Sequence, residues 1–110
     1  MTLEEALRAL EEYRVSIDAL DLCLLELLNQ RTLVVEQIGR VKRAAKLPIY
    51  EPRREDQVFD NVTSHNGGPL TPDAVKRIFE RIIDEMRTIQ RIRMETSTET
   101  GVDTSRDGDS

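Results

Sequence analysis

The sequence predicts an all-α protein with three helices per chain, one of them very long. Residues 2–43 contain no proline and a single glycine, and apolar residues recur there at alternating spacings of three and four, which is the pattern of one helix face. Aromatic residues make up only 4% of the chain, tryptophan is absent and charged residues reach 34%. This composition is typical of helical proteins and poor in the residues that favour strands.

The first helix is expected to begin at Thr2 and to run to about Arg43. Thr2 and Glu5 form a capping-box pattern, in which a hydroxyl and a carboxylate bond the free amide groups of a helix start. The first proline is Pro48, so nothing breaks the helix before residues 44–46. At about 1.5 Å per residue this helix is roughly 60 Å long, whereas a compact domain of this size has a radius of gyration of about 13 Å. The rest of one chain is therefore too small to cover the whole length of this helix.

A connection over residues 47–52 separates the first helix from the second. Pro48 and Pro52 stand four residues apart, and each pushes the residue before it out of the helical region. Pro52 suits the first position of a helix, where no amide hydrogen is needed. Apolar residues then recur at helical spacing between Arg53 and Ser64, which predicts the second helix.

The third helix is expected to begin after Thr71 and to end near Met94. Thr71 is a favourable helix cap, and the fixed backbone angle of Pro72 suits the first turn. An apolar stripe at helical spacing follows. Residues 95–110 are rich in Thr, Ser, Asp and Gly, so we expect a disordered polar tail after a helical domain that spans residues 1–94.

The composition also argues against several classes of function. A formal net charge of -5 argues against a nucleic-acid or acidic membrane surface, because such binding needs clustered Lys and Arg. Cys23 is the only cysteine, so we expect a buried thiol and a reducing cytoplasm. The chain has neither an export-signal pattern nor a stretch of about 18 apolar residues, so no membrane span is expected. His65 and Cys23 offer no metal-binding spacing, so no metal is expected.

Three cations interrupt the apolar row of the first helix. Arg14, Arg31 and Lys42 share this face, and a buried charge is costly unless it is paired or meets a ligand. Arg31 and Lys42 lie about 16 Å apart along the helix, so a small molecule with two anionic groups would fit between them. Gln90 from the third helix and Glu55 from the second are candidates to enter the same gap. Alternatively, these cations lie at the margin of the stripe and reach water or nearby acids, as helix cations usually do.

Arg14 poses a separate question, because it lies about 25 Å from Arg31 along the same helix. One small ligand could not touch both on one chain. In a dimer whose long helices run antiparallel, Arg14 of one chain would approach Arg31 and Lys42 of the other, and the excess helix length would be covered. The alternative is a surface arginine that pairs with Asp18, four residues further on.

The polar residues singled out above stand within ordered blocks. The blocks are Arg14-x-x-Ile17-Asp18-x-Leu20-Asp21-x-x-Leu24-Leu25, Leu27-Leu28-x-x-Arg31, Ile38-Gly39-x-x-Lys42, Pro48-Ile49-Tyr50-x-Pro52-x-Arg54-Glu55 and Ile78-Phe79-x-x-Ile82-Ile83 with Gln90. Over about residues 7–92 the chain thereby resembles the all-helical chorismate mutases. The resemblance implies an intertwined antiparallel homodimer with three helices per chain, in which each active site draws one arginine from the neighbouring subunit.

The resemblance also implies how the substrate is held. Arg14 of the partner, together with Arg31 and Lys42, would bind the two carboxylates of chorismate, and Arg54 would line the same site. Glu51 stands where some relatives have aspartate.

The remaining implied roles concern the other polar atoms of the substrate. Glu55 matches the acid that accepts the substrate hydroxyl, while Lys42 and Gln90 match the pair that donates to the ether oxygen. Met86 stands where some relatives have a serine near a carboxylate.

The implied activity is the rearrangement of chorismate to prephenate in phenylalanine and tyrosine biosynthesis. This reaction is intramolecular, so no cofactor is expected. Two alternatives stay open: an isochorismate pyruvate lyase on the same fold, and a non-catalytic domain that binds a metabolite or regulates another enzyme. The pair Arg54 and Glu55 favours the mutase over the lyase, and an intact set of polar residues argues against an inactive site.

Overall fold

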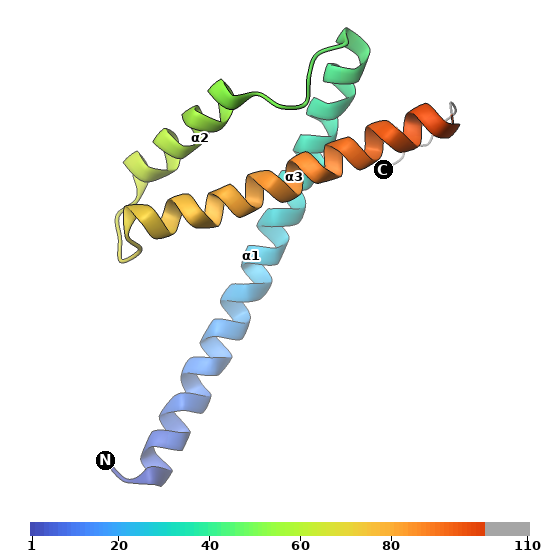
Figure 1. Ribbon diagram of the computed structural model, residues 1–110. Helices are drawn as coiled ribbons and strands as arrows, with labels where there is room; N and C mark the ends of the chain where they lie inside the picture. The colour runs from blue at the N-terminus through green and yellow to red at the C-terminus, as the bar shows by residue number, and fades with distance from the viewer. Residues whose placement is uncertain (101–110) are drawn as a thin grey trace. The chain divides into compact units, whose positions relative to one another are not determined.

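The computed structural model describes residues 1–100, with side chains up to Glu95, and consists of three helices (Figure 1). The helices are α1 (Leu3–Ala45), α2 (Pro52–His65) and α3 (Pro72–Thr100). No strand occurs in residues 1–100, so the predicted all-α class is confirmed. The chain divides into two units, Met1–Val34 and Val35–Ser110, and the boundary between them falls within α1.

Both predicted helix caps are present. The amide of Thr2 donates to Oε1 of Glu5 at 2.8 Å, and the amide of Glu5 donates to Oγ1 of Thr2 at 3.1 Å, which completes the capping box of α1. The bond from the Thr2 amide also lowers the pKa of Glu5 below its usual value. At the start of α3, the amide of Ala74 donates to Oγ1 of Thr71 at 3.1 Å, and Pro72 takes the first helical position.

Helix α1 ends in a Schellman turn centred on Lys46. The amide of Leu47 donates to the carbonyl of Lys42 at 2.7 Å, and the amide of Lys46 donates to the carbonyl of Arg43 at 3.2 Å. Lys46 has a φ angle of 57°, the left-handed region that usually takes glycine and costs another residue about 1 kcal/mol. This turn directs the connection back along the last turn of α1, toward the side chain of Lys42.

Within the unit Val35–Ser110, α2 and the first half of α3 form an antiparallel pair joined by a short loop (Figure 1). The buried apolar residues of the described chain all belong to this unit. They are Val35 from α1 and Val75, Ile83 and Met86 from α3. The buried residues of α3 lie on the apolar stripe that its sequence predicts, so the helical periodicity is confirmed.

The unit Met1–Val34 is a helix without a buried residue. Large apolar side chains along it are exposed, among them Leu3, Leu7, Leu10, Ile17, Leu20, Leu24, Leu25 and Leu27. Cys23 is exposed too, so its predicted burial is wrong for a single chain. The reason is physical: one helix alone has no second layer that could cover its apolar face.

Helix α3 continues to Thr100, six residues beyond the end that the sequence pattern indicates near Met94. Residues 95–100 contain neither Gly nor Pro, so no residue type there terminates a helix before Gly101. The rest of the predicted tail, residues 101–110, lies outside the described residues. In the described part of the chain, no helix is long and apolar enough to cross a membrane.

Candidate functional site

The ammonium group of Lys42 is held at the end of α1 by the connection that follows it. Its Nζ lies 2.7 Å from Oε1 of Glu51 and donates to the carbonyl of Ile49 at 2.9 Å. The Lys42 side chain is only 12% exposed, so it does not extend into water as a typical helix lysine does. The structure therefore brings together two of the predicted site residues, Lys42 and Glu51.

Glu51 remains charged through this contact. The hydrogen bond and the positive charge of Lys42 lower the pKa of the Glu51 carboxyl group below its usual value, and Arg54 adds a smaller effect in the same direction. Glu51 is the residue before α2, but its side chain makes no capping bond to that helix. Its carboxylate is directed to Lys42 instead.

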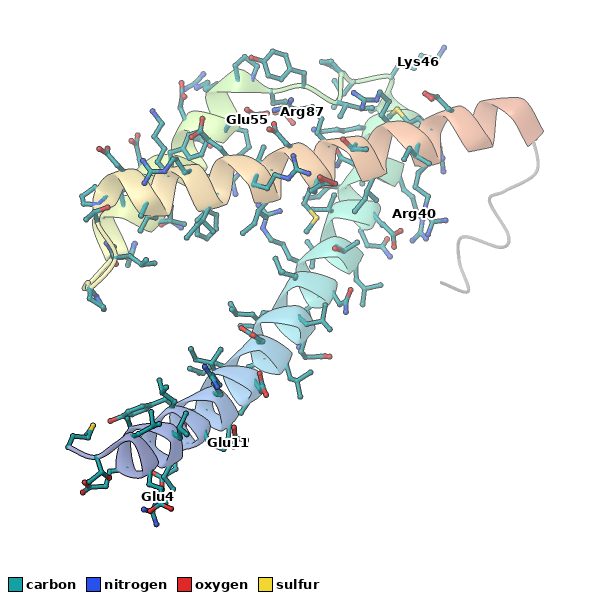
Figure 2. The ribbon with its side chains drawn as sticks, turned by 60° about the horizontal axis from the view of Figure 1, so that its bottom comes forward. Glu4, Glu11, Arg40, Lys46, Glu55 and Arg87 are labelled. Atoms are coloured by element: carbon teal, nitrogen blue, oxygen red, sulfur yellow. The ribbon has the colours of Figure 1, made fainter. Side chains whose placement is uncertain are left out.

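Glu55, in the first turn of α2, is bound by an arginine that sequence reasoning missed. Nη2 of Arg87 on α3 donates to Oε2 of Glu55, and Figure 2 shows the two side chains together. The Arg87 guanidinium also lies over the ring of Tyr50, with its Cζ 5.0 Å from the ring centroid. The position of Arg87 in the sequence could have indicated it as a site residue, because Arg87 lies three residues before Gln90 and so shares its side of α3.

Gln90 is the only buried polar residue in the described part of the chain, with 8% of its surface exposed. Its Nε2 donates to the carbonyl of Val35 on α1 at 3.2 Å. Gly39 lies beside this side chain, and a Cβ atom built at that position would lie 3.6 Å from Cγ of Gln90, an ordinary van der Waals contact. The structure thus places Gln90 against the last turns of α1. Beside it, Arg93 bonds Glu36 at 2.7 Å along one edge of a small groove that Gln90 also lines.

The other predicted residues occupy different environments. Arg54 is exposed, and its Nη1 donates to Oε1 of Gln57 at 3.4 Å. Met86 is buried in the core. Arg14 and Arg31 belong to the other unit, where Arg14 is exposed and Arg31 is half-buried.

Residues 35–95 therefore supply hydrogen-bond donors and acceptors that are each oriented by a neighbouring group. Lys42 and Gln90 offer an ammonium and an amide that can donate to a negatively charged oxygen, and Glu51 and Glu55 are carboxylates that can accept from a hydroxyl. No three His, Cys, Asp or Glu side chains among the described residues lie together so that they could hold a metal ion. Such a set is suited to binding and polarising a small oxygen-rich molecule.

Comparison with known proteins finds similarity over most of the chain. Residues 13–91 match the family model described as Chorismate mutase type II. The bifunctional chorismate mutase/prephenate dehydratase of Aquifex aeolicus is 34% identical over 74% of this chain and 24% of that protein. The T-protein of Haemophilus influenzae is 45% identical over 72% of this chain and 21% of that protein. The chain thus spans less than a quarter of the length of these relatives.

Shorter relatives match over nearly their whole length. The chorismate mutase of Methanocaldococcus jannaschii is 26% identical over 74% of this chain and 84% of that protein. A structure of the chorismate mutase (Form II) of Thermus thermophilus superposes with a TM-score of 0.74 at 26% identity, covering 76% of this chain and 94% of that chain. The Form I structure gives a TM-score of 0.68 at 28% identity over 71% and 98%.

Proposed function

Because this chain belongs to the chorismate mutase type II family, we propose that it catalyses the rearrangement of chorismate to prephenate. The family alone does not fix a reaction, since one fold can carry several chemistries. The proposal therefore depends on what the individual side chains can do.

The observation that carries the proposal is that Lys42 and Gln90 are each held in place while each keeps a donor to spare. The Lys42 ammonium has three N–H groups, and the carboxylate of Glu51 and the carbonyl of Ile49 use two of them. The Gln90 amide has two N–H groups, and the carbonyl of Val35 uses one. Each residue can therefore direct one N–H to the ether oxygen of chorismate without losing its own support.

These two donors match the demand of the reaction. The rearrangement breaks a C–O bond and forms a C–C bond within one molecule, so it needs neither a nucleophile from the protein nor a cofactor. Negative charge grows on the ether oxygen as the C–O bond breaks, and preorganised donors at that oxygen stabilise the transition state more than the ground state. The site must also hold the substrate in a compact, chair-like conformer.

The carboxylates of chorismate need cations, and we propose that two subunits supply them. Arg31 and Lys42 come from one chain of a homodimer, and Arg14 comes from the partner subunit. The exposed apolar face of residues 3–34 supports this assembly, because a second copy would cover it. Arg54 lines the site from the start of α2.

The remaining contacts complete the pocket. Glu55 accepts a hydrogen bond from the substrate hydroxyl, and Glu51 acts mainly by orienting Lys42. The thioether side chain of Met86 has no hydrogen to donate, so it contributes an apolar wall. We further propose that the protein works in the cytoplasm and supplies prephenate for phenylalanine and tyrosine synthesis, and its single cysteine suits a reducing compartment.

A turnover assay with purified protein tests the proposal directly. We expect chorismate to be consumed and prephenate to appear in equal amount, as measured by chromatography because the two are isomers. Release of pyruvate from isochorismate, without prephenate from chorismate, would replace the mutase with a lyase. Binding of chorismate without turnover would indicate a non-catalytic domain.

A further inference from the structure

Arg87 has no role in the site as proposed, yet it contacts the acid expected to bind the substrate hydroxyl. Its Nη2 on α3 reaches Oε2 of Glu55 on α2, thirty-two residues earlier in the chain (Figure 2). The two side chains are 29% and 22% exposed. The pair Arg81 and Glu85 on α3 offers a contrast, because its side chains are 78% and 52% exposed and lie one turn apart. Exposed pairs of that kind contribute little, whereas a half-buried pair between two helices fixes the direction of both side chains.

The guanidinium of Arg87 is oriented from three sides. The ring of Tyr50 lies against it at 5.0 Å, the carboxylate of Glu55 accepts from Nη2, and Oδ1 of Asp84 lies 3.5 Å from Nη1. Nε of Arg87, however, is buried and has no hydrogen-bond partner among the described residues. A buried N–H without a partner costs stability. The contacts around Arg87 therefore fix the position of its guanidinium charge, although the buried Nε lowers the stability of the fold.

We infer that Arg87 is a positioning residue, which binds Oε2 of Glu55 so that Oε1 of the same carboxylate is presented to the substrate hydroxyl. The inference rests on the proposed chorismate mutase activity. A carboxylate has two oxygens and about four acceptor positions, so the bond to Arg87 leaves Oε1 able to accept from a ligand. The ring of Tyr50 keeps the guanidinium plane, and with it the carboxylate, in one orientation.

This role predicts a particular kinetic signature. The substrate hydroxyl takes no part in the bonds that break and form, so its contact with Glu55 is present in the ground state and the transition state alike. Loss of such a contact raises KM more than it lowers kcat. Damage to folding does the opposite: it reduces the amount of active enzyme and lowers the apparent kcat at an unchanged KM.

The test compares steady-state kinetics with chorismate and melting temperatures across a small set of variants. Arg87→Gln is expected to raise KM about tenfold with a smaller change in kcat, since a displaced binding group commonly costs that much or more. Arg87→Lys restores the charge but not the planar fork, and should recover part of the loss. The control Arg81→Gln removes an arginine from an ion pair on the same helix, and should change neither parameter.

A double substitution decides whether Arg87 acts through Glu55. In a Glu55→Gln background, Arg87→Gln should change KM by less than about twofold, because coupled residues are not additive. Equal effects of Arg87→Gln in both backgrounds would overturn the inference, as would a fall in kcat at constant KM. If Arg87→Gln alone fails to fold, Arg87→Lys must show the partial rise in KM, and a wild-type KM there overturns the inference.

Failure of the inference and failure of the proposed function have different results. Wild-type protein that converts chorismate, with Arg87 variants of unchanged KM, removes the positioning role and leaves the activity intact. Wild-type protein that does not convert chorismate removes the activity, and the positioning role with it.

Discussion

Residues 1–34 and residues 35–95 use their apolar side chains in different ways. None of residues 1–34 is buried, although leucine recurs along that helix. In residues 35–95, by contrast, Val35, Val75, Ile83 and Met86 form a core, and Gln90 is buried with them. The second region buries part of its apolar pattern within one chain, whereas the first leaves its apolar pattern unburied.

We expect the exposed apolar residues of the first region to drive association between chains, and the polar groups of the second region to carry out the reaction. Full burial of a leucine is worth about 1.5–3 kcal/mol, so the exposed apolar side chains between Leu3 and Leu27 represent a large driving force for association. The oriented polar groups Lys42, Glu55 and Gln90 lie in the other region. We therefore expect substitutions of the apolar residues in the first region to act through dimer formation, and substitutions of these polar groups in the second region to act through turnover.

The largest effect is expected from an acid placed in the exposed apolar row. Leu24→Asp should abolish dimer formation and activity together, because each dimer would bury two unpaired carboxylates and lose leucine packing worth about 2–5 kcal/mol per site. Sedimentation velocity and circular dichroism would measure this change. Asn29→Asp, an acid at an exposed polar position of the same helix, is the control and should leave the dimer intact. An active Leu24→Asp dimer of normal mass would show that this row is not the interface.

Loss of a donor in the second region should reduce turnover without dissociating the protein. Lys42→Ala and Gln90→Ala each remove an N–H proposed to act at the ether oxygen, and a loss of about a hundredfold or more in kcat is the scale expected for one such donor. Lys76→Ala is the control, because Lys76 is an exposed lysine on α3 that lies near the ring of Phe59. Near-normal kcat in Lys42→Ala would refute the role assigned to Lys42.

A smaller effect is expected at Gly39, which lies beside the Gln90 side chain. A Cβ there would lie 3.6 Å from Cγ of Gln90, an ordinary contact, so Gly39→Ala should keep the activity. The same change should raise helix stability by up to about 1 kcal/mol. Gly39→Val adds two methyl groups toward Gln90 and should lower kcat about tenfold by displacing the amide. Equal activity of the two variants would contradict a fixed position for Gln90.

The smallest effect concerns acid stability. The pKa of Glu51 is lowered in the folded protein by Lys42, so the stability that this carboxylate contributes is present above its unfolded-state pKa and is lost as the pH falls through the lowered value. Glu51→Gln should therefore melt slightly below the wild type at pH 7, and the difference should vanish well below the ordinary pKa of 4.5. Glu80→Gln, at an exposed position on α3, provides the comparison. A difference that grows toward low pH would contradict this account.

The parts of the fold that follow from neighbouring residues were predictable from the sequence. The capping box of Thr2 and Glu5, the cap at Thr71 and the helical start at Pro52 each depend on side chains within one turn, and each is present. The end of α3 was placed too early, because the sequence pattern marks the loss of an apolar stripe and not the end of a helix. A helical turn can form without such a stripe.

The site was predictable only in part, because some of its contacts join residues that are far apart in the sequence. Lys42 stood out because a charged residue in an apolar row requires a partner, and Gln90 stood out because it matches a polar residue of the family. The contact between Arg87 and Glu55 joins two helices, and neither residue interrupts a pattern, so nothing in the local sequence marked the pair. The burial expected for Cys23 is not observed, because the helical segment that carries it buries none of its residues within this chain.

The most direct test of the central claim asks whether Arg14 of the first region serves the site of another chain. Arg14→Ala and Lys42→Ala homodimers should each be poorly active, because every site in either one lacks a cation. When the two variants are refolded together, about half of the dimers should be mixed, and in each of these one site combines an intact Arg14 with an intact Lys42. We predict that about a quarter of wild-type activity returns. Activity no higher than that of the separate variants, while mass measurement finds mixed dimers, would contradict a site shared between subunits.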